Sequence, residues 1–166
     1  MNEVALMNEE KTYTLPQAQL YFAADFHGKT WELLDKQKRT EDENERMLGC
    51  AYASLAHWRA AGTVVRHQRG EWMLARVYAV LGEAQPALHH AHLCIDLLNA
   101  HKSEMEDFDF AFAYEAVARA FAIAGDRPQA EKFIEKAQTA GKAIVEKEDR
   151  DIFFTEFNGG NWNGLK

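Results

Sequence analysis

The chain has little proline and cysteine and no long apolar run, and each of these shortages excludes a class of protein. Three prolines among 166 residues are too few for a collagen-like or proline-rich chain. Two cysteines, Cys50 and Cys94, form neither a disulfide framework nor a C-x-x-C motif. No apolar run approaches the ~18 residues of a membrane span, and residues 1–11 hold three glutamates where a secretory signal has a basic stretch. We therefore expect a cytoplasmic protein with reduced thiols and no membrane partner.

Basic residues are also in short supply. Nineteen lysines and arginines are set against 26 aspartates and glutamates, which gives a formal net charge of −7. An acidic surface repels phosphate backbones, so we expect no nucleic acid partner. A local cluster of basic residues, Arg66, Arg69 and Arg76, is the one feature that would favour a nucleic acid partner. With 47% apolar residues, the chain can build the core of a single domain, 1–166, without metals or disulfides.

Helix start and stop signals divide the chain into regular segments. A capping residue is followed three positions later by Glu or Gln at four places, namely Thr14 with Gln17, Thr40 with Glu43, Ser103 with Glu106, and Asp126 with Gln129. The apolar period breaks at Gly62, Gly82 and Gly125, where a left-handed glycine is expected to end a helix. These signals predict six helices, at about 15–36, 41–61, 65–81, 84–101, 105–124 and 127–147. We expect a flexible N-terminus over 1–14, and a C-terminal tail over 153–166 that is either folded back or disordered.

Aromatic residues recur at helical spacing and are predicted to be core. They are Tyr21, Phe22, Phe26, Trp31, Phe108 and Phe112. Between positions 108 and 114 aromatic residues alternate with Asp and Ala, which is typical of a strand. The alanine-rich continuation over 115–124 favours a helix for the whole segment, because alanine is the best helix former.

The helices show an internal repeat. Short turns make consecutive helices antiparallel neighbours, and aligning Gly82 with Gly125 relates two hairpins. The alignment places Leu74, Ala75 and Tyr78 over Val117, Ala118 and Phe121, and Ala87 and Cys94 over Ala130 and Ala137. This arrangement of small and aromatic residues is the tetratricopeptide pattern, although the offset of 43 residues exceeds the usual 34 or so. We therefore predict an all-α, tetratricopeptide-like, right-handed stack of three hairpins.

The middle of the chain carries a more specific series of short motifs. They are His57-Trp58, Gly62-Thr63, Arg69-Gly70-Glu71-Trp72, Arg76-Val77-Tyr78-Ala79-Val80-Leu81, Pro86-Ala87-Leu88, Asp107-Phe108-Asp109, Ala113-Tyr114-Glu115-Ala116 and Glu148-Asp149-Arg150. This series resembles a family of bacterial tetratricopeptide-like proteins over about residues 25–152. The resemblance implies the same fold and assigns no reaction or ligand.

Polar residues on faces that should be buried are the candidate binding residues. They are Arg46, Ser54, His57, Arg69, Glu71, Glu115 and Arg119. If the stack gathers them on one wall, His57 and Glu115 are candidate proton acceptors, and Arg46, Arg69 and Arg119 are candidate anion clamps. The alternative is a structural network, in which buried ion pairs such as Glu115 with Arg119 fix the register of the hairpins.

Metal binding and catalysis have weaker support in the sequence than ligand binding. His90 and Cys94 lie one helical turn apart and are weak metal candidates, but two ligands do not make a site, so we predict no metal and no cofactor. No nucleophile with its base can be identified from spacing, and no catalytic residue is assigned. We predict a protein-interaction module with a protein or peptide partner, itself a homo-oligomer, most simply a dimer. A small-molecule or metal-binding protein, with or without enzymatic activity, is the alternative.

Overall fold

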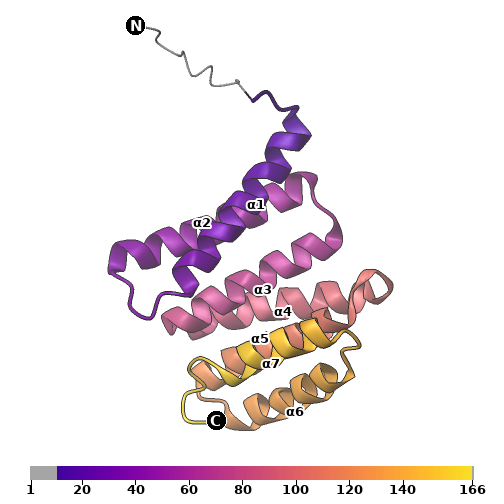
Figure 1. Ribbon diagram of the computed structural model, residues 1–166. Coiled ribbons are helices and arrows are strands. Elements are labelled where there is room, and N and C mark those ends of the chain that lie inside the picture. Colours follow the sequence, from indigo (N-terminus) through magenta and orange to yellow (C-terminus); the bar gives the residue numbers. More distant parts are fainter. Residues whose placement is uncertain (1–10, 166) are drawn as a thin grey trace, which may run out of the picture.

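The computed structural model describes residues 11–165, and within that range it is all-helical, with no strand (Figure 1). The helices are α1 (Leu15–Leu34), α2 (Glu41–Ala61), α3 (Val64–Leu81), α4 (Ala84–Ala100), α5 (Asp107–Ala124), α6 (Arg127–Ala143) and α7 (Lys147–Asn158), with a short 3₁₀ turn (Lys102–Glu104) before α5. The all-α prediction is confirmed, including the segment from Phe108 to Tyr114. The predicted number of six helices is wrong, because the described chain forms a seventh.

The helix starts follow the capping signals at three of four places. Thr14 and Thr40 form reciprocal capping boxes, and the Asp126 carboxylate accepts from the backbone N–H of Gln129. The predicted cap at Ser103 is wrong, because Ser103 lies in the 3₁₀ turn. There the carboxylate of Asp109 accepts from the backbone N–H of Glu106 at 3.0 Å, so α5 starts at residue 107.

All three predicted glycine stops are confirmed, and two of them have the expected left-handed conformation. Gly82 and Gly125 have φ of 79° and 78° and end α3 and α5 in the left-handed conformation. Gly62 instead has φ −90° and ψ −179°, which is extended backbone. Thr63 follows as the extended cap of α3, so the predicted left-handed conformation of Gly62 is wrong.

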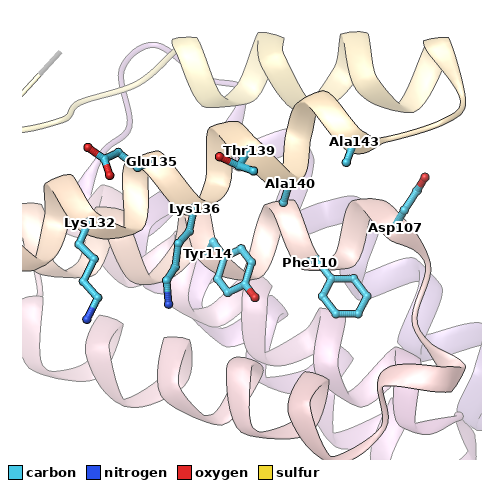
Figure 2. Close-up of a pocket in the computed structure, with 9 residues that line it drawn as sticks. All are labelled: Asp107, Phe110, Tyr114, Lys132, Glu135, Lys136, Thr139, Ala140 and Ala143. Carbon is cyan, nitrogen blue, oxygen red and sulfur yellow. The ribbon is translucent and has the colours of Figure 1, made fainter.

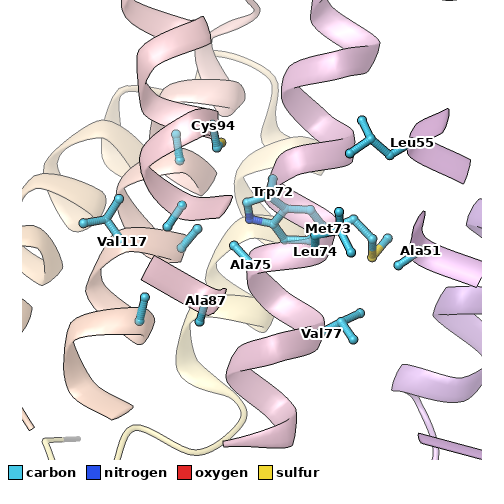
Figure 3. Close-up of a cluster of buried hydrophobic side chains, with 14 of the residues drawn as sticks. Ala51, Leu55, Trp72, Met73, Leu74, Ala75, Val77, Ala87, Cys94 and Val117 are labelled. Carbon is cyan, nitrogen blue, oxygen red and sulfur yellow. The ribbon is translucent and has the colours of Figure 1, made fainter. Parts of the chain in front are cut away.

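The helices pack as successive neighbours from one end of the molecule to the other (Figure 1). α1 pairs with α2, α3 with α4 and α5 with α6, while α3 also packs on α5. One core cluster is centred on α3, where Trp72, Met73 and Leu74 meet residues of α2, α4 and α5 (Figure 3). A second cluster joins α5, α6 and α7. None of the helices in the described range is long and apolar enough to cross a membrane.

The seventh helix replaces the first part of the predicted C-terminal tail. Phe153 and Phe157 of α7 are buried against α5 and α6. Beyond α7 the chain folds back, because Trp162 is buried and donates from Nε1 to the carbonyl of Phe157 at 3.0 Å. Asn163 donates to the carbonyl of Ala122 at the end of α5. Of the predicted flexible N-terminus, 1–14, residues 1–10 lie outside the described range.

The turn between α6 and α7 carries no glycine or proline. Instead, Arg150 donates to the carbonyl of Ile144 at 2.8 Å, and the Asp107 carboxylate accepts from the backbone N–H of Val145 at 2.8 Å. These two side chains form hydrogen bonds with the Ile144 carbonyl and the Val145 N–H. In a turn closed by glycine, backbone groups at the helix end bond to one another instead. The helix break is therefore made by tertiary contacts.

Not all of the aromatic residues predicted to be core are buried. Tyr21 and Phe22 on α1 keep 50% and 42% of their surface exposed, and only Ala23 and Thr30 of that helix are fully buried. α1 packs on α2 but has little contact with the rest of the chain. As the first helix of the series, it lacks a neighbour on its outer side.

Candidate functional site

A buried carboxylate, Glu115, joins α5 to α3. It accepts from Nη1 of Arg76 on α3 at 2.8 Å, from Arg119 one turn along α5, and from Nε1 of Trp72 at 3.4 Å. Arg76 also pairs with Glu156 on α7 at 2.7 Å. The ion pair between Glu115 and Arg119 expected from their spacing is present. Burial alone would raise the pKa of Glu115, but Arg119 and Arg76 outweigh it and lower that pKa, so the carboxylate is ionised at neutral pH.

Arg119 also holds the C-terminal segment. Its Nη2 donates to the carbonyls of Glu156 and Gly159, at 2.8 and 3.0 Å. Its guanidinium lies 4.1 Å from the centroid of the Trp162 ring, within the range of a cation–π contact. A single side chain thus connects α5 to the end of α7 and to the chain beyond it.

A second ion pair joins α3 to α5. Arg69 donates from Nε and Nη2 to the two oxygens of Asp109, at 2.7 and 2.9 Å, in the two-pronged geometry that favours arginine. The same guanidinium lies 4.8 Å from the centroid of the Phe108 ring. Asp109 is buried, while Arg69 is partly open to solvent.

These ion pairs border a hollow of about 420 Å³ between α1, α3, α5 and α7, which we call the aromatic hollow. Its walls include Trp31, Trp72 and Phe112, with ring centroids 5.8 Å apart for the two tryptophans and 5.3 Å apart for Trp72 and Phe112. Ile152 of α7, half exposed, lies at its edge. The remaining lining residues are His27, Asp35, Gln68, Arg69, Phe108, Asp109 and Glu156.

A second hollow of about 430 Å³ adjoins the first, since both include Trp31, Asp35 and Glu156. We call it the polar hollow, because Arg39, Arg76 and Arg119 line it. Arg39 donates to the carbonyls of Leu33, Leu34 and Lys36 and so closes the end of α1. The two hollows together form one groove along the first, third, fifth and seventh helices, and we call it the odd-helix groove.

The aromatic hollow has one unpaired polar atom at its lining. Gln68 on α3 is 1% exposed and donates from Nε2 to the sulfur of Cys94 at 3.2 Å. Its Oε1 has no hydrogen-bond partner among the described residues. A buried acceptor left unpaired costs roughly 1–3 kcal/mol, so its occurrence in a residue that lines a hollow calls for an explanation, and a bound polar group is one.

The candidate binding residues on α2 lie away from the groove, and Ser54 and His57 serve the packing of α1. Ser54 is buried and donates to the carbonyl of Ala23 at 2.8 Å. His57 hydrogen-bonds Gln19 through Nδ1 and stacks on the Phe26 ring, with centroids 6.0 Å apart. Arg46 is exposed. Of the seven predicted binding residues, Arg69 and Arg119 line the groove, and Glu115 is fully buried and accepts from Arg76 and Arg119.

Glu71 belongs to a separate network that also contains His90. The Glu71 carboxylate pairs with Arg59 and lies 2.7 Å from Nδ1 of His90. The other His90 nitrogen lies 3.2 Å from the hydroxyl of Tyr52, which is 2.8 Å from the hydroxyl of Tyr78. Burial and the bond to Tyr78 raise the pKa of Tyr52 to about 12.

The two weak metal candidates do not converge. His90 is bonded to Glu71 and Tyr52, and the Cys94 sulfur is bonded to Gln68. Burial raises the pKa of the Cys94 thiol, which disfavours the thiolate that binds metals. Within residues 11–165 no group of three or more potential ligands could hold a metal ion.

A wider hollow of about 660 Å³ lies on the outer side of the α5–α6 hairpin (Figure 2). Phe110, Tyr114 and Ala140 belong to its lining, and Lys136 lies over the Tyr114 ring. Lys132 and Glu135 point in opposite directions in Figure 2. Polar groups that do not converge on one point offer no defined ligand geometry, so the odd-helix groove is the stronger candidate.

Most of the residues that form the groove were not predicted from the sequence. Asp109 of α5 and Glu156 of α7 are charged residues of its lining that were not among the candidates. Trp31 was predicted to be core but lines the hollow, and Gln68, which has the unpaired oxygen, was not singled out. The motif Asp107-Phe108-Asp109 was a local signal, but its partner Arg69 lies 40 residues away.

Comparison with protein-family models, with curated proteins and with solved structures found no match for this chain. Any function is therefore inferred from the geometry of the groove itself.

Proposed function

We propose that the chain is a tetratricopeptide-like interaction module that binds a segment of a partner protein in the odd-helix groove. The observation that carries the proposal is the aromatic hollow, in which Trp31, Trp72 and Phe112 meet beside ion pairs that are already satisfied. Aromatic side chains and arginines dominate the binding energy of protein interfaces. The groove combines both.

The stacked-hairpin interpretation supports a long groove. Two features support the repeat: Leu74 and Val117 are both fully buried, and Gly82 and Gly125 end their helices with the same geometry. In such a stack every second helix lines the same side. The groove follows the helices expected on that side, α1, α3, α5 and α7.

The ion pairs make the groove rigid before a ligand arrives. Arg69 with Asp109 ties α3 to α5, and Arg76 joins Glu115 on α5 to Glu156 on α7. A preformed groove loses less conformational entropy on binding than one that must be assembled. The same pairs leave few uncompensated charges on the groove wall, which suits a ligand with a large apolar anchor.

The test is a selection of random peptides displayed on phage, followed by affinity measurements with the purified chain. Ile152→Glu places a charge at the edge of the aromatic hollow on a residue that is half exposed, so the fold is expected to tolerate it. Val145→Glu is the matched control, because Val145 is 78% exposed and outside the groove lining.

We expect the selected peptides to share a large apolar or aromatic residue and to bind the parent and Val145→Glu equally. Binding to Ile152→Glu should be weaker by about tenfold or more, which corresponds to the loss of one good contact. Equal binding to all three proteins would show that the peptides use another surface and would overturn the proposal.

A small ligand in the aromatic hollow is the second candidate, favoured by the unpaired Oε1 of Gln68. A hollow of about 420 Å³ is of the size that holds small molecules, and such sites place one or two polar groups in apolar walls. Native mass spectrometry of the purified chain tests it. Excess mass that is lost on denaturation, and that is absent from Ile152→Glu, supports a small ligand; a clean mass leaves the peptide proposal as the better one.

A further inference from the structure

The N-terminal half of α1, together with Tyr13 just before it, carries large apolar side chains that the described chain leaves partly exposed. Tyr13, Leu15, Tyr21 and Phe22 keep 46%, 74%, 50% and 42% of their surface exposed. The rings of Tyr13, Tyr21 and Phe22 form a row, with centroids 5.4 Å apart at each step. In Figure 1 this half of α1 projects beyond α2 at the end of the molecule. We call these four residues the α1 face.

The α1 face is also uncharged. Residues 12–24 contain no Asp, Glu, Lys or Arg, although 27% of the chain is charged. The first charges along the helix, Asp25 and Lys29, pair with each other at 2.7 Å. A surface without charge offers nothing to an oppositely charged partner, and it does not repel an identical copy.

From these observations we propose that the α1 face binds the α1 face of a second copy of the chain, in a two-fold symmetric dimer. The proposal concerns a different surface from the odd-helix groove and does not depend on it. A two-fold contact pairs a surface with itself, which suits a row of rings and aliphatic side chains. It also ends the series of hairpins, since the outermost helix of a repeat stack needs a polar outer face or a cover.

The exposed area matches what a dimer needs. Aromatic side chains bury about 150–250 Å² each, so four large side chains about half exposed offer apolar surface on the order of 400 Å² per copy. A standard interface buries about 800 Å² per partner, and homodimer interfaces are about 65% apolar. The α1 face therefore supplies most of the apolar area that a standard homodimer interface contains. Neighbouring polar residues such as Gln17 would form the polar rim of that interface. A two-fold contact occupies the α1 face of both copies, so association through this face ends at a pair.

The test is sedimentation velocity of the full chain over a wide concentration range, with two variants and a control. Leu15→Glu is the sharper variant, because Leu15 is the first residue of α1 and that helix has no acidic residue in its first turn. A carboxylate there favours the helix through its dipole, so the isolated chain should keep or gain thermal stability while the dimer loses it. Tyr21→Glu places a charge at the centre of the face, and Val145→Glu adds the same charge far from it.

We expect a concentration-dependent monomer–dimer equilibrium for the parent and for Val145→Glu. The dimer dissociation constant should rise by about tenfold or more in Leu15→Glu and in Tyr21→Glu, with helix content unchanged by circular dichroism. A parent chain that stays monomeric at every concentration would overturn the proposal. A dimer that survives both glutamate variants would overturn it equally, because the contact would then lie elsewhere.

Discussion

Arg69 on α3 and Asp109 on α5 lie 40 residues apart in sequence and form two parallel hydrogen bonds, of 2.7 and 2.9 Å. Asp109 also accepts from the backbone N–H of Glu106 and so fixes the start of α5. The pair therefore sets the register of two helices and forms part of the wall of the aromatic hollow. Stability and the shape of the groove depend on the same two side chains.

We expect Asp109→Ala to lower the free energy of unfolding by about 3 kcal/mol, because it leaves a partly buried guanidinium unpaired and removes the cap of α5. Arg69→Met should also be destabilising, since it leaves the Asp109 carboxylate buried without its counter-charge. Urea unfolding measures both. The double variant should cost less than the sum of the singles, whereas strict additivity would show that the two residues do not act as a pair.

Glu115→Gln is expected to lower the free energy of unfolding at neutral pH by about 3 kcal/mol, because Arg76 and Arg119 lose a shared buried counter-charge. Glu131→Gln is the control: Glu131 forms an exposed pair with Arg127, and its loss should change little. Chemical denaturation of the three proteins gives the comparison. An equal effect of the two substitutions would contradict the assigned role of Glu115.

The same carboxylate makes stability depend on pH. The pKa of Glu115 is lowered from its ordinary value of 4.5, so the folded chain holds fewer protons than the unfolded chain just below that value. Its stabilising contribution is therefore complete above about pH 4.5 and is lost as the pH falls through the folded-state pKa. We expect the parent to lose stability more steeply than Glu115→Gln below pH 4.5. Parallel curves for the two proteins would show that Glu115 does not control acid unfolding.

Two glycine-to-alanine substitutions should change the free energy of unfolding in opposite directions. A Cβ at position 141 would lie 2.6 Å from Cδ1 of Phe153, whose ring is fully buried, so Gly141→Ala should destabilise by about 1–3 kcal/mol. At Gly49, within α2, an added Cβ meets nothing within 4 Å, and Gly49→Ala should stabilise by about 0.5–1 kcal/mol. Thermal melts of the two variants provide the measurement. A stable Gly141→Ala would mean that α7 does not pack as closely on α6 as described.

The phenol of Tyr52 should ionise at a higher pH than an ordinary tyrosine. Its pKa is raised to about 12 by burial and by the bond to Tyr78, so the ultraviolet difference between the parent and Tyr52→Phe should show a phenol titrating near pH 12. A difference titration centred on the ordinary value of 10 would show that the Tyr52–Tyr78–His90 cluster is not formed in solution.

Much of the fold follows from local signals in the sequence. The caps at Thr14, Thr40 and Asp126 and the left-handed glycines at 82 and 125 act within a few residues, so they are visible in the sequence. The break between α6 and α7 was missed because it depends on Arg150 and on a carboxylate of α5. A turn that is satisfied by distant side chains leaves no local pattern.

The candidate site was harder to predict for the same reason. All of the predicted polar residues except the exposed Arg46 were correctly recognised as at least partly buried, but spacing along one helix does not reveal which neighbour a residue faces. His57 and Ser54 turn to α1, and Glu71 turns to α4. Arg69 and Arg119 line the groove, while Glu115 is fully buried and accepts from Arg76 and Arg119. The groove is formed by four helices that are distant in sequence, and that arrangement exists only in the folded chain.

The central claim, binding in the odd-helix groove, is tested most directly by the indole N–H signals of the four tryptophans in a nitrogen-15 NMR spectrum. Trp31 and Trp72 line the aromatic hollow, while Trp58 on α2 lies outside both hollows and serves as an internal control. The account predicts that peptides selected on the parent chain shift the signals of Trp31 and Trp72 and leave that of Trp58 in place. Saturable binding that moves Trp58 and leaves Trp31 and Trp72 unchanged would contradict it.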